Sequence, residues 1–102
     1  MDIVLTNEVK WYIQNLSSIA EKAQIYQYLE RQAELGHRLK EPVSKSLREG
    51  INEIRPGPHR LLFFYHKGQM IIVHAFRKKT QKTPGHEIEA VVRKKEEWIR
   101  HE

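Results

Sequence analysis

The chain has 102 residues, of which 39% are hydrophobic, and it contains no cysteine. That length fits one domain spanning residues 1–102, and the lack of thiols excludes disulfides, cysteine nucleophiles and zinc–thiolate sites. The net charge is +5, and the apolar run at the N-terminus is too short for a signal peptide or a membrane helix. We therefore expect a cytoplasmic protein with no membrane partner.

The first part of the chain predicts a strand followed by two helices. Residues 2–5 fit a short strand, and the apolar spacing over residues 7–16 is that of an amphipathic helix. Ser18 with Glu21 three positions later is a capping-box pattern, which indicates the start of a second helix. Gly36 is expected to end that helix, because glycine accepts the left-handed conformation at a helix C-terminus.

The middle of the chain predicts a connector and then three strands. Residues 39–50 are expected to be irregular, with one helical turn near residues 45–48. Residues 51–55 predict a short strand that ends at a Pro-Gly-Pro turn. Two runs rich in aromatic and β-branched residues, 59–66 and 69–76, fit a hairpin with a two-residue turn between them.

The end of the chain predicts a helix over residues 87–100. The element order is then β-α-α-β-β-β-α, an α+β fold built on a small antiparallel sheet. The two N-terminal helices are expected on one sheet face and the C-terminal helix on the other. The sheet residues that the C-terminal helix is expected to cover are Leu62, Phe64, Ile71 and Val73.

The hairpin register predicts a cluster of arginines. In an unbroken register Arg60 pairs with Ala75, which puts Arg77 on the same face as Arg60 at an exposed end of the sheet. Pairing in the preceding turn sets Arg55 opposite Arg60, with Glu53 nearby. The planar guanidinium matches phosphate, so such a cluster fits a phosphate site; the alternative is that the arginines pair with carboxylates at the sheet edge.

The charge of the chain is unevenly distributed. Residues 1–50 are neutral in sum, and no acidic residue lies between Glu53 and Glu87. A basic surface without acidic neighbours favours a polyanion as the partner, although a solvated basic face without a ligand has the same pattern. The basic residues of this interval are Arg55, Arg60, Lys67, Arg77, Lys78, Lys79 and Lys82.

Histidines near the arginine cluster are candidates for proton transfer. His59 borders the cluster and His86 follows the basic loop, although either one is also readable as an ordinary surface histidine. His74 and Phe76 are expected on the face under the first two helices, with His74 as a hydrogen-bonded core residue. No pair of histidines has metal-ligand spacing on one helix, so neither a metal nor a cofactor is expected.

Four segments resemble one family pattern. KSLREGINEIR at residues 45–55 and HAFRKKTQKTP at residues 74–84 are similar to signatures of the HigB-like, phage-associated branch of the RelE/ParE toxin superfamily. RLLFFY at residues 60–65 and EIEA at residues 87–90 fit the same pattern. The most specific part is residues 78–84.

The resemblance implies a RelE-like fold and the toxin of a type II toxin–antitoxin system. It implies a ribosome-dependent, metal-independent endoribonuclease that cleaves mRNA and inhibits translation, with a helix-turn-helix DNA-binding antitoxin as the cognate partner. In this reading the RNA's own 2′-hydroxyl attacks the phosphate.

The resemblance assigns phosphate contact to Arg60 and to Arg77 with Lys78, and position near the arginine cluster or in the basic loop adds the other candidates. The catalytic candidates are Arg60, Arg77 and His59, and those for RNA and phosphate binding are Arg55, Lys78, Lys79 and Lys82. RelE has a tyrosine after its last strand that assists proton transfer, and here Thr83 and Pro84 take that place. The proton-transfer group is left open between His59, Glu53, Lys79 and His86.

Two alternatives belong to other classes. ParE-type members of the superfamily inhibit DNA gyrase without cleaving RNA, and a phage-derived homologue can also be inactive. A converging set of arginines favours the endoribonuclease, because inhibition of gyrase requires no phosphate site on the sheet.

Overall fold

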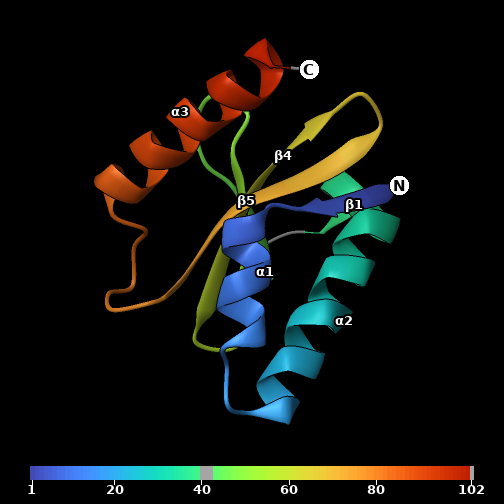
Figure 1. The fold of residues 1–102 in the computed structure, drawn as a ribbon, viewed down its shortest axis with the longest axis vertical. Helices are drawn as coiled ribbons and strands as arrows, with labels where there is room; N and C mark the ends of the chain where they lie inside the picture. The colour runs from blue at the N-terminus through green and yellow to red at the C-terminus, as the bar shows by residue number, and fades with distance from the viewer. Residues whose placement is uncertain (40–42, 102) are drawn as a thin grey trace.

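The computed structural model describes residues 1–39 and 43–101, and its strands form one sheet in the order β1-β5-β4-β3-β2. Helices α1 and α2 cover one face of this sheet and α3 covers the other, as Figure 1 shows. The α+β class is therefore confirmed. The elements are β1 (Asp2–Leu5), α1 (Asn7–Gln14), α2 (Ile19–Leu35), the 3-10 helix η1 (Gly36–Arg38), β2 (Ser44–Ser46), β3 (Asn52–Ile54), β4 (His59–His66), β5 (Gln69–Arg77) and α3 (Gly85–Arg100).

The sheet is mixed, which corrects the expectation of an antiparallel sheet. Strand β1 pairs in parallel with β5, with Ile3 opposite Met70 and Leu5 opposite Ile72, while the other pairings are antiparallel. Alternation of apolar residues is the same in both directions of a strand, so the sequence pattern carried no information on this point.

Strand β2 corrects the helical turn expected near residues 45–48. Its three residues pair with β3, and the hairpin turn between them has positive φ at Glu49 (54°) and Gly50 (76°). The Leu47 amide donates to the Ile51 carbonyl oxygen at 2.8 Å, which closes the turn. Strand β2 lies at the sheet edge, where backbone pairing holds it. Its polar sequence lacks the apolar alternation that would have predicted a strand.

The sequence signals for the two ends of α2 and for the β4–β5 turn are confirmed. The Ser18 hydroxyl accepts from the Glu21 amide at 3.1 Å, and Gly36 after α2 has φ of 56°. Lys67 and Gly68 both have positive φ (49° and 75°), as a two-residue hairpin turn requires. The hairpin therefore begins in the predicted register.

A β-bulge in β5 then changes that register. Phe63 pairs with Ile72 and Leu62 pairs with His74, which leaves Val73 as an additional residue between them. Val73 packs in the core under α3, and His74 bonds to Glu87 of α3, so two consecutive residues face the same helix. A bulge produces this arrangement because it adds one residue to one strand only.

Every residue of β5 beyond the bulge lies on the face opposite to the predicted one. Arg60 pairs with Phe76 rather than Ala75, and Arg77 pairs with His59. Phe76 packs under α3, as His74 does, instead of under the first two helices. Arg77 lies on the α2 side and contacts Glu21.

Each face of the sheet has its own apolar core. The core under α1 and α2 includes Val9, Ile13, Ile25, Leu29, Ile54, Leu61, Phe63, Met70 and Ile72. The core under α3 contains Ile51, Leu62, Phe64, Ile71, Val73 and Val91, with Trp98 partly buried beside it, which confirms the predicted contact of the C-terminal helix. In the described part of the chain, no helix is both long and apolar enough to cross a membrane.

Candidate active site

A cavity of about 410 Å³ lies at the end of the sheet where β4 begins and β5 ends. The chain leaves β5, swings away from the sheet and returns to α3 (Figure 1). This loop supplies half of the residues that line the cavity. The Lys78 amide donates to the Pro58 carbonyl oxygen at 2.8 Å, which fixes the base of the loop. The lining residues are Tyr12, Arg60, Ala75, Phe76, Arg77, Lys78, Lys79, Thr80, Gln81, Lys82, Thr83, Pro84, His86 and Glu87.

The cavity wall carries a large excess of positive charge. Its lining includes five arginine or lysine side chains and one carboxylate, that of Glu87. Arg77 and the lysines are exposed, so their charges are available to a ligand. A cavity of this composition fits an anion with several charged oxygens.

A chain of hydrogen bonds lies beside the cavity on the α1–α2 side. The Tyr12 hydroxyl is 2.7 Å from His59 Nδ1, and His59 Nε2 is 2.7 Å from Glu21 Oε1. Arg77 Nη2 lies 3.3 Å from the same carboxylate oxygen. The His59 side chain is fully buried, and its ring makes an edge-to-face contact with Tyr12.

The carboxylate fixes the direction of one of these hydrogen bonds, and with His59 neutral the direction of the other follows. A carboxylate only accepts, so His59 Nε2 carries the proton that is donated to Glu21. In a neutral imidazole Nδ1 is then an acceptor, and it accepts from the Tyr12 hydroxyl. Burial raises the pKa of Tyr12 above its usual value, while the charge of Arg77 lowers it and that of Glu21 raises it.

Arg60 is buried, which corrects its expected position at an exposed sheet end. Only 9% of the residue is accessible, and Nη1 donates to the carbonyl oxygens of Gly57 (2.9 Å) and His59 (2.7 Å). Burial lowers the pKa of Arg60, the charge of Glu53 opposes this shift and the charge of Arg55 adds to it. Arg60 still lines the cavity, so it supplies positive charge from the cavity floor and also fixes the turn before β4.

The predicted convergence of three arginines on one sheet face does not occur, because of the bulge. Arg55 and Arg60 lie close together, whereas Arg77 is on the opposite face. Arg55 Nε donates to Glu53 Oε1 at 2.7 Å, and the Thr83 hydroxyl donates to Glu53 Oε2. Neither Arg55 nor Glu53 lines the cavity; this pair instead anchors the end of the basic loop to β3.

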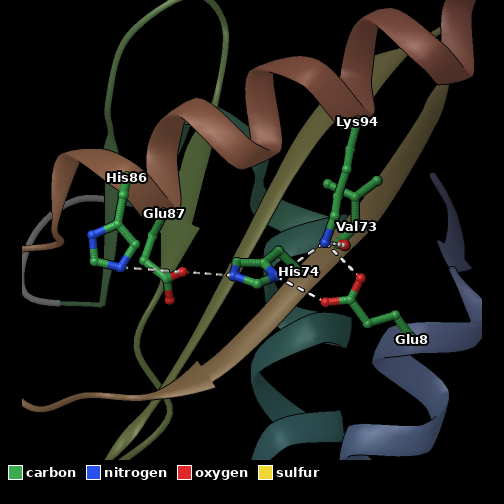
Figure 2. Close-up of polar contacts among 6 residues, drawn as sticks. All are labelled: Glu8, Val73, His74, His86, Glu87 and Lys94. Carbon is green, nitrogen blue, oxygen red and sulfur yellow. Dashed lines mark hydrogen bonds and ion pairs between the residues drawn. The ribbon is translucent and has the colours of Figure 1, made fainter.

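Two further histidines, His74 and His86, have different surroundings. Figure 2 shows His74 between Glu8 of α1 and Glu87 of α3, at 2.9 and 3.2 Å, with Lys94 beside its Nδ1. His86 lines the cavity, but its side chain is 79% exposed and lies 3.8 Å from Glu87. His74 is hydrogen-bonded as expected, although on the α3 side of the sheet.

The sequence interpretation included every arginine and lysine of the cavity wall but not Tyr12. Arg60, Arg77, Lys78, Lys79, Lys82 and His86 all line the cavity, as does Tyr12. Tyr12 lies three residues after Val9 and one before Ile13, the two buried residues of α1, and this spacing was the available signal that its phenol turns toward the sheet. Its contact with His59 spans 47 residues, and no local pattern indicates it.

Comparisons with known proteins identify a family and a fold. The family described as phage derived protein Gp49-like (DUF891) matches residues 12–96. A chain in the crystal structure of the toxin–antitoxin complex RelBE2 from Mycobacterium tuberculosis aligns with a TM-score of 0.61 and 18% identity, covering 76% of this chain and 96% of that chain. No curated protein sequence matches. Among the described residues no group of histidine and carboxylate side chains could hold a metal ion.

Proposed function

The chain belongs to the family of phage-derived Gp49-like proteins, and we propose that it is the toxin of a toxin–antitoxin pair that inhibits translation by cleaving mRNA on the ribosome. The reaction is attack of the RNA's 2′-hydroxyl on the adjacent phosphate. The products are a 2′,3′-cyclic phosphate and a 5′-hydroxyl end. The chain itself supplies the groups that bind the phosphate and transfer protons, without a metal.

The observation that carries this proposal is the cation-rich cavity. Five basic side chains and a single carboxylate line it, and phosphate in the transition state of cleavage has more negative charge than in the bound substrate. Donors aimed at such developing charge stabilise the transition state more than the ground state. A face that merely improved solubility would not need its cations around a concave surface.

The individual roles follow from position in the cavity. Arg77 is exposed at the end of β5, and its guanidinium binds the scissile phosphate. Arg60 adds charge from the floor, and the exposed lysines of the loop, Lys78, Lys79 and Lys82, bind the flanking backbone phosphates. Arg55 and Glu53 bond to each other away from the cavity, so we leave both out of the proposed site.

The partner of a toxin is its antitoxin. The fold is shared with a chain from a toxin–antitoxin complex, which supports a partner of this kind. An acidic segment of the antitoxin would match the basic cavity, and screening by salt would then weaken the complex. We expect the affinity of the purified pair to fall with rising salt; an affinity that stays constant would indicate apolar docking instead.

The test is direct cleavage of labelled mRNA. The purified chain is added to ribosomes programmed with a 5′-labelled message, and we expect short fragments that end in a 2′,3′-cyclic phosphate. A matched message with a single 2′-deoxynucleotide at the cut position must resist cleavage there. An intact natural message, together with inhibition of DNA supercoiling by gyrase, would contradict the proposal and favour the ParE-type alternative.

A further inference from the structure

Tyr12 joins the cation-rich cavity to the buried His59 side chain and, through it, to the partly exposed carboxylate of Glu21. It lines the cavity with Arg77 and the loop lysines. Its hydroxyl donates to His59 Nδ1, and His59 in turn donates to Glu21. The phenol oxygen has lone pairs left to accept a hydrogen bond from a ligand in the cavity.

Three of the candidates for proton transfer that the sequence offered are less well placed than Tyr12. His59 is fully buried with both ring nitrogens occupied, so it cannot contact RNA directly. Glu53 is buried, does not line the cavity and bonds to Arg55 and Thr83. Lys79 contributes positive charge to the phosphate site. Its ammonium group would have to lose a proton, and with it this charge, before it could act as a base.

We propose that Tyr12 takes the proton from the attacking 2′-hydroxyl while it passes its own proton to His59, an inference that rests on the proposed endoribonuclease function. The 2′-hydroxyl proton moves to Tyr12 Oη, and the phenolic proton moves to His59 Nδ1. The 2′-oxygen forms its bond to phosphorus, and the bond from phosphorus to the 5′-oxygen breaks. The 5′-oxygen takes a proton from water, and His59 later returns its proton to water through Tyr12.

Glu21 and Arg77 complete this arrangement. The imidazolium formed on His59 faces the Glu21 carboxylate at 2.7 Å, which stabilises it as the acidic member of a catalytic triad does. Arg77 contacts the same carboxylate at 3.3 Å and lines the cavity. Glu21 and His59 are therefore positioning residues that act through Tyr12, and Arg77 links them to the phosphate site.

The protonation state of the phenol agrees with a relay. Burial raises the pKa of Tyr12, and the charge of Arg77 only partly opposes it. Tyr12 is then a neutral phenol near pH 7 and not a phenolate. A neutral phenol accepts a proton only if it gives one away in the same step, and His59 Nδ1 is the acceptor within reach.

The test compares Tyr12→Phe with Tyr65→Phe in the ribosome cleavage assay. Tyr65 is a matched control, because its hydroxyl also bonds inside the fold, accepting from Gln32 at 2.8 Å, but lies outside the cavity. We expect Tyr12→Phe to reduce the single-turnover cleavage rate about 10²- to 10⁴-fold, the usual range for loss of a proton-transfer group. Binding of the 2′-deoxy message should change less than about threefold.

The pH dependence separates a chemical role from a structural one. Without a side-chain base, solvent hydroxide must take the proton, so the rate of Tyr12→Phe should rise roughly tenfold per pH unit where the wild-type rate levels off. His59→Gln keeps a polar side chain but has no basic nitrogen, and it should show the same slope. The double variant should be no slower than either single variant, because the two residues act as one unit.

Two results overturn the inference in different ways. If the wild-type chain cuts the message and Tyr12→Phe cuts it at the same rate with the same pH dependence, Tyr12 is not the base and the proposed function stands. If the folded wild-type chain leaves the message intact in this assay, the proposed function fails and the relay fails with it. Circular dichroism of each variant verifies that it folds; should His59→Gln unfold, the rate and slope of Tyr12→Phe decide.

Discussion

His59 and His74 lie on opposite faces of the same sheet, and both have hydrogen bonds on both ring nitrogens. His59, under α1 and α2, lies between a phenol and a carboxylate and is fully buried. His74, under α3, lies between the carboxylates of Glu8 and Glu87 and beside an ammonium, and 15% of its side chain is exposed (Figure 2). The same residue type is thus embedded in two different charge arrangements.

The difference shows how neighbours decide what a histidine does. Around His74 the contacts join α1, β5 and α3, and the positive Lys94 is answered by Glu8, so this cluster fastens two helices to the sheet. Around His59 the contacts lead through Tyr12 to a cavity where positive charge exceeds negative charge. An excess of one charge next to a proton relay favours a ligand, whereas a network of paired opposite charges favours structure.

The largest effect is expected from removing α3, the helix whose residues Glu87 and Lys94 contact His74. Deletion of residues 86–102 would expose the core under α3, where Val91, Leu62 and Phe64 are fully buried. Each such side chain contributes about 1.5–3 kcal/mol, against a total stability of roughly 5–15 kcal/mol for a small domain. We expect the truncated chain to be unfolded or aggregated by circular dichroism and sedimentation.

The control for this deletion is Glu96→Ala, which changes an exposed residue of the same helix. It should melt cooperatively within a few degrees of the wild type. A truncated chain that is monomeric and melts cooperatively would show that α3 is an accessory element and that the His74 cluster does not stabilise the fold.

The next largest effect is expected from Arg77→Ala, which changes a residue of the cavity that is paired with His59 in the sheet. Loss of one donor to a developing phosphate charge costs about 10²- to 10³-fold in rate, roughly 3–4 kcal/mol. The melting temperature should hardly change, since Arg77 is the exposed member of its ion pair with Glu21 and solvent-accessible pairs contribute at most about 1 kcal/mol. The rate is measured on programmed ribosomes with Arg93→Ala, an exposed arginine of α3 that does not line the cavity, as the control. Equal rates for the two variants would argue against a phosphate site in the cavity.

Local sequence signals predicted most of the fold. The errors of the prediction arose where strands that are distant in the sequence pair with each other. Helix caps, glycines and the Lys67-Gly68 turn act within a few residues, so their positions agree with the structure. The bulge at Val73 is different, because an additional valine in an apolar strand looks like any other residue until its partner strand is known. That single residue moved His74, Phe76 and Arg77 to the opposite face.

The candidate site was predictable to a similar degree. The gap in acidic residues indicated the basic loop, and its lysines do line the cavity. The burial of Arg60 follows from the position of β4 between β3 and β5, a property of the whole sheet. Tyr12 was missed because its partner His59 is 47 residues away, so only the folded chain shows the relay.

A smaller effect is expected where the basic loop is anchored. The Thr83 hydroxyl donates to the buried Glu53 carboxylate, and Thr83→Val removes this donor. Loss of a hydrogen bond to a buried charge costs about 1–3 kcal/mol, which urea denaturation measures. Thr80→Val is a matched control, because Thr80 lies in the same loop but is exposed and donates only to the Lys82 carbonyl oxygen. If both variants lose the same stability, the Thr83 hydroxyl does not anchor the basic loop to β3.

The smallest effect concerns the charge balance around His74 and sharpens the comparison through pH. Burial by itself would raise the pKa of Glu8, but the hydrogen bonds and charges of Lys94 and His74 lower it below 4.5 overall. A carboxylate whose folded pKa is lowered stabilises the fold above its unfolded pKa and loses this contribution as the pH falls through the folded value.

Half of the Glu8 side chain is exposed, so solvent screening limits the contribution to about 0.5 kcal/mol. We therefore expect Glu8→Gln to be less stable than the wild type near pH 7, and the difference in the free energy of unfolding to disappear as the pH falls through the folded pKa of Glu8. Glu96→Gln, on the helix that carries Lys94, controls for loss of an exposed carboxylate. A stability difference between Glu8→Gln and the wild type that persists at low pH would mean that Glu8 acts through packing. The ion pairs around His74 would then not be what fastens α1 to α3.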